Sequence, residues 1–402
     1  MNRLANGQGS NSAALRRHNE RVILTALRRL GEASKADLAR RAGLTHNATG
    51  QIVHELEQQR LICTVGKRMG ARGQPATLLR LDPGGIHSIG LKIGRRSIDA
   101  LLVDFGGNAI EIRRQERAFP LPQEALAIAL AEIKALRAAV PRSSRGALAG
   151  VGLAMPYNLG NWRRELGITS DAYAAWNDFD IAEELRKATG LPVFVENDGT
   201  AAAMAELFQG HGREFNDFVS IFIGTATGGG VVLDGDYRRG ITGNAGDIGL
   251  IPVSPSRLPS ARKHSRPFEV LLARASIGAL LRHFENNVVV AKSRAELDLA
   301  IESHPDLVDE WLADCADSLV VPVLAIGCVL DLECIVIDGD LPRDVITRLV
   351  DRLRGLLQST VPEARQPPSV LVGAVGRNAA SVGAAILPLH LNYSPNRQLL
   401  FA

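Results

Sequence analysis

Apolar residues near the start of the chain recur with helical spacing. The first stripe consists of Val22, Ile23, Ala26, Leu27 and Leu30. It predicts a helix that begins near Asn19 and ends before Gly31. Residues 1–14 are polar and small, so we expect them to form a disordered arm.

Two shorter helical patterns follow, separated by a tight turn. Ser34 is placed to cap the first, Thr45 is placed to cap the second, and Gly43 marks the turn between them. The inward-facing positions are Leu38, Ala39, Ala48, Ile52, Val53 and Leu56. A turn of this length that contains a glycine is typical of a helix-turn-helix.

A basic segment then lies between two short apolar stretches, 61–63 and 76–81. Two strands around a basic, glycine-rich tip predict a wing that lays cations on phosphates or in a minor groove. Short polar side chains on the exposed face of the third helix can reach base edges in a major groove. The residues predicted to contact DNA are Ser34, Lys35, Thr45, His46, Asn47, Thr49, Gln51, His54, Lys67, Arg68 and Arg72. The alternative is a solvated helical bundle with an incidental run of charge.

Charge is distributed unevenly along the chain. Residues 1–82 carry 14 Lys and Arg against 6 Asp and Glu, whereas the other 320 residues carry 32 against 37. A basic head on a mildly acidic body favours nucleic acid as the partner of the head.

From residue 86 onward, strand and helix patterns alternate. Strands are predicted over 88–93, 97–104, 109–117, 148–153, 192–195, 218–223, 333–338 and 369–372. Helices are predicted over 123–140, 179–189, from about 200, over 267–285, 294–303, 305–330 and 341–357, and up to 387. This alternation predicts an α/β fold with a mixed sheet. Because both halves repeat the same order of elements, we expect a duplicated unit with a cleft between two lobes.

The length of 402 residues predicts more than one domain. We divide the chain into the arm 1–14, a winged helix-turn-helix domain 15–82 and a body 83–402. With no run of eighteen apolar residues and no signal-peptide core at the polar start, we expect a cytoplasmic protein without a membrane partner. The four cysteines, Cys63, Cys315, Cys328 and Cys334, form no C-x-x-C pair, and we expect reduced core residues.

Residues 193–251 contain the main candidate ligand site. One predicted strand ends in Glu196, Asn197 and Asp198 just before an alanine-rich helix, and another runs into the glycine-rich segment 224–230. An acid at a helix start can bind the hydroxyl groups of a ligand. A glycine-rich segment lets backbone N–H groups approach an anion or a sugar ring. Together they predict one small-molecule site.

Several short motifs in the body together resemble the ROK family, which comprises sugar-responsive repressors and sugar kinases. They are Glu196-Asn197-Asp198, the segments 224–230 and 243–249, Trp176 ahead of the helix 179–189, and the segment 376–380. The resemblance covers the chain from about residue 17 through the last helix. It implies an actin-like fold of two lobes with a sugar in the cleft. The ligand-binding residues that it implies are Asn197, Asp198, Gly228, Gly229, Asn244 and Asp247.

One position departs from the pattern of the family's kinases. They carry an aspartate in the glycine turn of the first strand, which manages nucleotide and magnesium, and the equivalent place here holds Lys92. A cation repels Mg²⁺ and cannot ligate it, which argues against phosphoryl transfer. Lys92 could pair with a phosphate or with Asp104, or be a surface lysine at a strand end.

Asp198 matches the family's catalytic base, which takes the proton of a sugar hydroxyl. Without a competent metal site, we expect it to accept a hydrogen bond from that hydroxyl. Asn197 can both donate and accept, as polyol recognition requires. The alternative is that the pair only caps the following helix.

The zinc motif of the family is also altered. Its Glu-x-Gly-His pattern reads Asp247-Ile248-Gly249-Leu250, and its cysteine-rich loop reads 254–264 without a cysteine. Leucine cannot ligate a metal, so we expect no zinc and no other cofactor. In that loop Arg257, Arg262 and Lys263 could hold an anionic ligand, and His264 is expected to be solvated. Departures at 155–158 and 170–173 further indicate that the effector need not be a common hexose.

The sequence thus predicts a transcriptional regulator of carbohydrate genes, with repression favoured, rather than an enzyme, and it assigns no catalytic residue. We expect it to bind operator DNA as a homodimer or tetramer and to respond to a sugar or sugar derivative. A sugar kinase with an appended DNA-binding head is the alternative. A third possibility is a constitutive DNA-binding protein whose body only dimerises.

Overall fold

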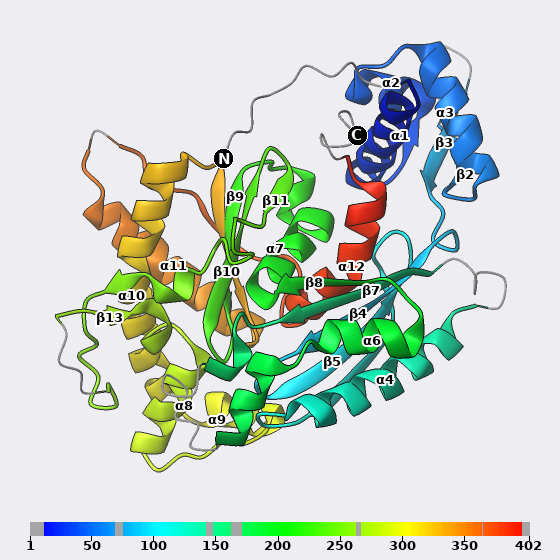
Figure 1. Ribbon diagram of the computed structural model, residues 1–402. Coiled ribbons are helices and arrows are strands. Elements are labelled where there is room, and N and C mark those ends of the chain that lie inside the picture. Colours follow the sequence, from blue (N-terminus) through cyan, green and yellow to red (C-terminus); the bar gives the residue numbers. More distant parts are fainter. Residues whose placement is uncertain are drawn as a thin grey trace, which may run out of the picture.

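A head of helices and short strands sits on one end of a two-lobed body (Figure 1). The computed structural model describes residues 12–68, 75–141, 148–161, 171–262, 267–363 and 365–395. The described elements of the head are α1 (Ser12–Leu30), β1 (Ala33–Ser34), α2 (Lys35–Ala42), α3 (His46–Gln58), β2 (Ile62–Arg68) and β3 (Ala76–Leu81). β2 and β3 pair antiparallel, and β1 joins the other edge of β3. The predicted order of three helices and a hairpin is confirmed.

The first helix begins earlier than its apolar stripe predicts. Residues 12–14, assigned to a disordered arm, are the first residues of α1. Ala14 is fully buried, and Arg16 pairs with Glu55 of α3. Alanine and arginine are strong helix formers, and this tertiary contact extends the helix beyond its periodic core. Residues 1–11 of the predicted arm lie outside the described residues.

The first lobe contains a mixed five-stranded sheet in the order β6-β5-β4-β7-β8. Its strands are β4 (His87–Ile93), β5 (Ser97–Val103), β6 (Ala109–Glu116), β7 (Leu148–Met155) and β8 (Val193–Asn197). The pairs β4–β5 and β5–β6 are antiparallel, whereas β4–β7 and β7–β8 are parallel. Helices α4 (Pro122–Ala139) and α6 (Ile181–Thr189) cover one face and α12 (Ala379–Tyr393) the other.

The second lobe repeats this arrangement in the order β11-β10-β9-β14-β15. Its strands are β9 (Phe218–Ile223), β10 (Thr227–Leu233), β11 (Asp236–Arg238), β14 (Cys334–Gly339) and β15 (Val370–Val372). Three strands are again joined antiparallel and three parallel. Helix α7 (Asp198–Gln209) covers one face, and α8 (Ile277–Asn286), α9 (Arg294–Ser303), α10 (Pro305–Leu330) and α11 (Arg343–Thr360) form the layer beyond the other. The repeated strand order confirms the predicted duplication.

Helices α7 and α12 pack against each other between the two sheets (Figure 1). Small residues allow this close approach. A Cβ on Gly383 of α12 would lie 1.6 Å from the carbonyl oxygen of Ala201 in α7, and one on Gly152 of β7 would lie 1.8 Å from that of Ala384. The alanine-rich pattern of both helices therefore reflects a tight helix–helix contact at the centre of the molecule.

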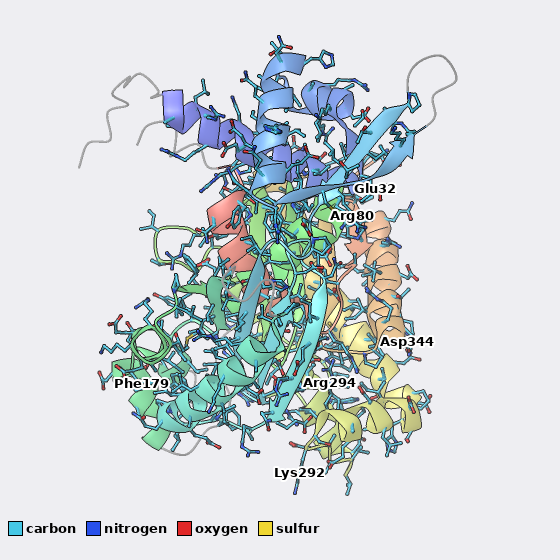
Figure 2. All side chains as sticks on the ribbon, turned by 90° about the vertical axis from the view of Figure 1, so that its right-hand side faces the viewer. Glu32, Arg80, Phe179, Lys292, Arg294 and Asp344 are labelled. Atoms are coloured by element: carbon cyan, nitrogen blue, oxygen red, sulfur yellow. The ribbon has the colours of Figure 1, made fainter. Side chains whose placement is uncertain are left out.

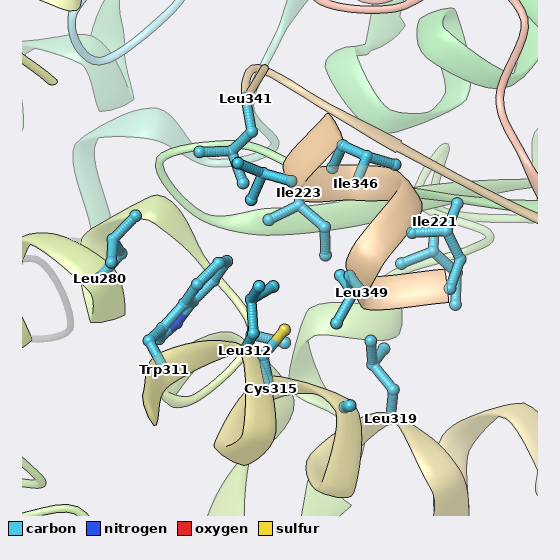
Figure 3. Packing of buried hydrophobic residues seen from close by; sticks show 14 of the residues in the cluster. Ile221, Ile223, Leu280, Trp311, Leu312, Cys315, Leu319, Leu341, Ile346 and Leu349 are labelled. Carbon is cyan, nitrogen blue, oxygen red and sulfur yellow. The ribbon is translucent and has the colours of Figure 1, made fainter. Parts of the chain in front are cut away.

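The core of the second lobe surrounds Trp311 of α10 (Figure 3). The indole N–H of Trp311 donates to the carbonyl oxygen of Arg274 at 3.0 Å, so this large side chain is buried with its polar atom satisfied. Within the described part of the chain, α10 alone is long and apolar enough to cross a membrane, and half of its apolar window is buried in the molecule. The helix predicted over 305–330 is confirmed, and it packs against α8, α9, α11 and β12 (Pro252–Val253).

Three further predictions about the body are corrected. The segment 267–285 contains β13 (Glu269–Val270), paired with β12 (Pro252–Val253), then the short 3₁₀ turn Leu271–Ala273 and α8, not one helix. The glycines 228–230, expected as part of a glycine-rich segment after the strand 218–223, belong to strand β10. Cys328 is exposed, whereas Cys315 and Cys334 are core residues as expected.

Candidate functional site

The caps of the head helices fold as their residue types predict. The Ser34 hydroxyl accepts from the backbone N–H of Asp37 at 3.2 Å, while the Asp37 carboxylate accepts from the N–H of Ser34, which forms a capping box. Thr45 caps α3, and Gly43 ends α2 with the positive φ of 66° that favours glycine. These local signals determine where α2 ends and where α3 begins.

Most of the predicted DNA-contacting side chains are exposed on the head. They are Lys35, Thr45, His46, Asn47, Gln51, His54, Lys67 and Arg68. The prediction for Thr49 is wrong, because its side chain is fully buried among the core residues of α3 and cannot reach DNA. Ser34 is also buried, and its hydroxyl is engaged with Asp37, so only its capping role is confirmed. Arg72 lies outside the described residues.

Asp37 joins the wing to α2, a role that periodicity does not reveal. Its carboxylate accepts from Arg68 of β2 at 2.9 Å and from Arg40 at 3.3 Å. The hydrogen bonds from Ser34, followed by those from Arg68, hold the pKa of Asp37 below its usual value. The carboxylate thus stays ionised and holds one of the wing cations in place.

The acidic motif at the end of β8 lies in the cleft between the lobes. The side-chain oxygen of Asn197 accepts from the N–H groups of Gly199 and Thr200, so this residue caps α7. The half-buried Asp198 begins α7 and accepts from the N–H of Gly199. Its carboxylate lines the cleft. Because Asn197 supplies the helix cap, the Asp198 carboxylate is not needed for capping.

A small cavity of about 40 Å³ gathers most of the predicted ligand-binding residues. Asn197, Asp198, Gly228, Asn244 and Asp247 all line it. The Asn244 side-chain amide donates to the Asp247 carboxylate at 2.8 Å, which fixes both groups at its edge. Burial raises the pKa of Asp247 above its usual value. A ligand with hydroxyl groups would find both donors and acceptors here.

Gly229 does not line this cavity, contrary to the prediction. It is buried in β10, and a Cβ there would lie 2.5 Å from the carbonyl oxygen of Ser220. On the neighbouring helix, a Cβ on Gly199 would lie 2.5 Å from the N of Gly229. The glycines therefore allow the start of α7 to approach β10, and Gly228 alone of the three contributes to the cavity wall.

A larger cavity of about 240 Å³ adjoins the small one and shares Arg95, Asp198, Ala226 and Gly228 with it. Lys92 lines it, and its ammonium lies 3.7 Å from the Asp99 carboxylate of the neighbouring strand β5. The suggested partner Asp104 is instead engaged with Asn108. Lys92 and Asp99 are both largely buried, so the surface-lysine alternative is wrong.

Arg95 is a cleft residue that the sequence analysis passed over. It lies in the turn between β4 and β5, is 8% exposed and lines both cavities. Burial lowers the pKa of its guanidinium, an effect opposed by the nearby charge of Asp198. The two adjacent arginines, Arg95 and Arg96, were the available signal, but the sequence does not indicate that the side chain of one of them turns inward.

Glu196, just before Asn197, is buried beside the cleft. Burial raises the pKa of its carboxyl to about 7, and the Arg239 guanidinium, 2.7 Å away, opposes the rise. Arg239 is mostly exposed, so it compensates only part of the desolvation. Glu196 thus titrates close to neutral pH.

The altered zinc motif lies next to the small cavity. Leu250 is partly exposed at the end of a short 3₁₀ turn, and Ser254 and Ser256 bind Arg274 and Asp314 of the second lobe. Within the ranges that the structure describes, no three His, Cys, Asp or Glu side chains gather as a metal site would require. Lys263 and His264 lie outside those ranges, so the expected absence of zinc stays a prediction.

Comparison with known proteins relates the body to one family. The sequence profile of the ROK family matches residues 88–390. An uncharacterized protein, y4fQ, of Sinorhizobium fredii is 28% identical over 373 residues, covering 92% of this chain and 90% of its own length. The xylose repressor of Bacillus spizizenii is 24% identical over 235 residues, which span 58% of this chain and only 60% of the repressor.

Solved structures have the same fold. A ROK family transcriptional regulator described as a homologue of the Escherichia coli MLC protein superposes with a TM-score of 0.66 at 21% identity, covering 97% of this chain and all of its own. A ROK family glucokinase from Streptomyces griseus, in complex with glucose and AMPPNP, has a TM-score of 0.58 at 22% identity. It covers 75% of this chain and 98% of its own.

Proposed function

The chain belongs to the ROK family and has its actin-like, two-lobed fold, and from this premise we propose that it is a DNA-binding transcriptional regulator controlled by a sugar-like effector. The family contains both repressors and sugar kinases. The observation that carries the proposal is the direct connection, through α7, between the cleft and a basic head with exposed polar residues.

The head supports DNA binding by its charge and surface. Asn47 and Gln51 extend from the exposed side of α3, where amide groups suit bidentate contacts to adenine. Lys67 and Arg68 at the start of the wing, together with Lys35 of α2, offer cations to the phosphates. We propose that α3 enters the major groove and that the wing contacts the backbone beside it.

Helix α7 connects the effector site to the head. Asp198 lies at its first residue, and at its other end the backbone carbonyls of Leu207 and Phe208 accept hydrogen bonds from Arg28 of α1 at 3.1 and 2.7 Å. The Arg28 guanidinium also lies 4.2 Å from the centre of the Phe208 ring. A shift of α7 caused by a ligand at Asp198 would therefore move the first helix of the head.

A second contact joins the head to the body through α12. Arg21 of α1 donates to the carbonyl oxygens of Leu391 and Ser394 at the end of α12. Because α12 packs on the sheet of the first lobe and α7 on that of the second, the head contacts a helix from each side of the cleft. Lobe rotation would therefore reorient the head.

We propose that the effector acts by population shift. It must bind the lobe arrangement that presents the heads wrongly for DNA more tightly than the arrangement that presents them correctly. The DNA-binding unit is a homodimer or a tetramer of such chains, because symmetric half-sites require two heads.

A sugar kinase is the second candidate function. Asp198 is present at the cleft, and a family glucokinase with glucose and AMPPNP shares the fold. Lys92 and its ion pair with Asp99 disfavour it, because a buried ammonium opposes Mg²⁺ at that place. Turnover measured by a coupled assay of ADP release across a sugar panel would support the kinase, and no turnover is expected.

Selection of genomic fragments on the full chain, followed by gel-shift titration, tests the regulator directly. We expect nanomolar-range binding to a few fragments, with affinity falling steeply as salt increases. A sugar-type ligand should then change that affinity by about 5- to 150-fold. Equal binding to every fragment would contradict the proposal. Specific binding without any ligand response would favour a constitutive DNA-binding protein.

A further inference from the structure

A short hairpin of the second lobe reaches the head. Residues 234–235 join β10 to β11, and a Cβ on Gly235 would lie 3.1 Å from a guanidinium nitrogen of Arg29 in α1. Directly after this turn, the carboxylate of Asp236 lies 2.9 Å from Nε2 of His390 in α12. Figure 2 shows α12 (red) directly beneath the head. The hairpin therefore contacts the first head helix and also a helix on which the head rests.

The ion pair between Asp236 and His390 lies partly inside the molecule. The His390 side chain is 9% exposed and that of Asp236 is 46% exposed. The rings of Tyr237 and His390 meet edge to face with their centroids 5.5 Å apart. Burial alone would raise the pKa of Asp236, but the hydrogen bond and then the charge of His390 outweigh burial and lower this pKa. Asp236 therefore stays ionised near neutral pH, and the charge of His390 sets the strength of their contact.

Other titratable groups on the hairpin and on the elements packed against α12 have partners of their own. They are Asp234 and Arg238 of the hairpin, Arg21 of α1, Tyr393 of α12, and His87 and Asp104 of the first lobe. Arg238 pairs with Asp234 at 2.8 Å, and Arg21 donates to backbone carbonyl oxygens at the end of α12. Burial lowers the pKa of His87, and the charge of Asp104 opposes this. Helix α7 faces α12 with alanines and other apolar residues. Asp236 is thus the acid that His390 contacts.

The hairpin also continues toward the effector cleft. Arg239 follows β11 directly and pairs with Glu196 at 2.7 Å. The carbonyl oxygen of Arg239 accepts from the N–H of Ala245 at 3.1 Å. Ala245 lies in the segment from Asn244 to Asp247, whose two ends line the small cavity. A ligand that moves this segment therefore moves β11 with it.

We propose that the contact between Asp236 and His390 is a proton-dependent latch that couples the effector cleft to α12 and the head. This inference rests on the proposed function and adds a regulatory input to it. Histidine is the side chain that ordinarily changes its charge between pH 5 and pH 8. A protonated imidazole gives Asp236 a charge-assisted hydrogen bond, whereas a neutral imidazole leaves a weaker one. The latch therefore holds the second lobe to α12 at mildly acidic pH and loosens as pH rises.

Hydrogen exchange of the full chain, read by mass spectrometry without DNA or ligand, tests the latch itself. After correction for the intrinsic effect of pH on exchange, we compare peptides from β11 and from the end of α12. They should exchange about fivefold faster at pH 8 than at pH 6, because an ionised partner strengthens a hydrogen bond by about that factor. Most of this difference should disappear in His390→Gln and in Asp236→Asn. The half-exposed position of Asp236 keeps the test valid if His390→Gln unfolds early in a thermal melt.

The matched control is His304→Gln, just before α10 and outside the hairpin. It should keep the pH difference of the unchanged chain. Glu196 also titrates in this range, but it is present in every chain compared and contributes equally to each.

Gel-shift titration at pH 6 and at pH 8 tests the coupling to the head. In the unchanged chain, the effector-induced change in operator affinity should be up to about fivefold larger at pH 6, because the tight latch transmits more of the motion of β11. Asp236→Asn should give the smaller change at both pH values.

Two exchange results would overturn the latch: protection that does not change with pH in the unchanged chain, or a pH difference that persists in both latch variants. Loss of the difference in His304→Gln would also overturn it, because the effect would then not belong to His390. An effector response that is the same at both pH values and in Asp236→Asn would overturn the coupling. Failure of the regulator proposal is recognised separately, as the absence of specific DNA binding at either pH, since hydrogen exchange measures the latch without DNA.

Discussion

At the scale of single residues, burial decides which polar side chains can serve recognition. Thr49 and Gln51 lie two positions apart on α3, yet Thr49 is fully buried and Gln51 is exposed. In the part of the chain that the structure describes, the Thr49 hydroxyl finds no hydrogen-bond partner. A side chain of the right type for reading a base is therefore a core residue.

The first prediction concerns the difference between exposed and buried polar residues of α3. Asn47→Ala and Gln51→Ala should each relax base preference by about 1–3 kcal/mol at one operator position, because a bidentate contact is lost. Thr49→Val keeps the shape of a buried residue and is the control, with base preference unchanged. Competition gel shifts with single-base variants of a selected fragment measure the effect. An equal loss of affinity for all sequences in the Asn47 and Gln51 variants would contradict base reading.

Glu196 makes the stability of the body sensitive to pH. Its pKa is about 7 in the folded chain, above the ordinary value of 4.5. Between pH 4.5 and pH 7 the carboxyl group is therefore protonated in the folded state but ionised in the unfolded state. Stability from this group is therefore lost as pH rises from about 4.5 to 7. In Glu196→Gln that loss disappears, and Tm should fall less between pH 5 and pH 8 than in the unchanged chain.

Differential scanning calorimetry at closely spaced pH values checks this expectation. Glu184→Gln on α6, where the side chain is 41% exposed, is the control and should leave the pH profile of Tm unchanged. Parallel profiles for Glu196→Gln and the unchanged chain would show that Arg239 fully compensates the buried carboxylate.

At the scale of elements, the residues of α7 and α12 suit close packing of the two helices against each other more than the stability of each helix alone. Their glycines and alanines are explained by what lies opposite, since Gly383 faces the backbone of Ala201. In α11, by contrast, an added Cβ on the exposed Gly355 meets nothing within 4 Å. Glycine is therefore required for packing at position 383 of α12 but not at position 355 of α11.

Gly383→Ala and Gly355→Ala form a matched pair. Gly383→Ala should destabilise the chain by about 1–3 kcal/mol or more, because the helices must separate to admit a methyl group. Gly355→Ala should stabilise it by about 0.5–1 kcal/mol through the lower backbone entropy of alanine in the unfolded state. Urea unfolding measures both. A loss of stability at Gly355 equal to that at Gly383 would rule out the packing explanation.

Arg28 tests α7 as the connection between cleft and head. Burial lowers the pKa of its guanidinium to about 9, so it remains charged at neutral pH. Arg28→Met keeps the apolar stem but removes both hydrogen bonds to α7. We expect operator affinity without effector to change little, while the effector-induced change shrinks toward onefold. Arg17→Met, on the exposed face of the same helix, should keep the full response in the same gel-shift titration.

At the scale of the whole molecule, the head contacts two central helices, and these helices pack on the sheets of the two lobes. The head rests on α7 and α12, which belong to different lobes, so its orientation depends on the angle between them. The proposed regulator would need a second head to convert a small rotation into loss of operator binding, since two half-sites lie at a fixed spacing of about 34–36 Å or a multiple.

This spacing yields the last prediction. Insertion of five base pairs between the half-sites of a selected operator should weaken binding strongly, because about half a helical turn places the second half-site on the opposite face of the DNA. Insertion of ten base pairs should restore part of the affinity. Gel-shift titration of the three fragments measures this. Equal affinity for all three would contradict recognition by a rigid pair of heads.

The sequence by itself determined the elements and their order. Local sequence patterns are sufficient to predict the helix caps at Ser34 and Thr45 and the strand at 218–223, because these features depend on neighbours within a few positions. The repeated order of the two halves follows from the sequence of such elements. Family motifs also located the cleft residues from Asn197 to Asp247, of which five line one small cavity.

The tertiary structure decided how those residues are used. It placed Thr49 in the core, turned Arg95 inward, paired Lys92 with Asp99 and made the glycines 228–230 a strand that packs on α7. These outcomes depend on which distant backbone or charge lies opposite each side chain. Periodicity reports the direction of a side chain relative to its own element but carries no information about what it meets there.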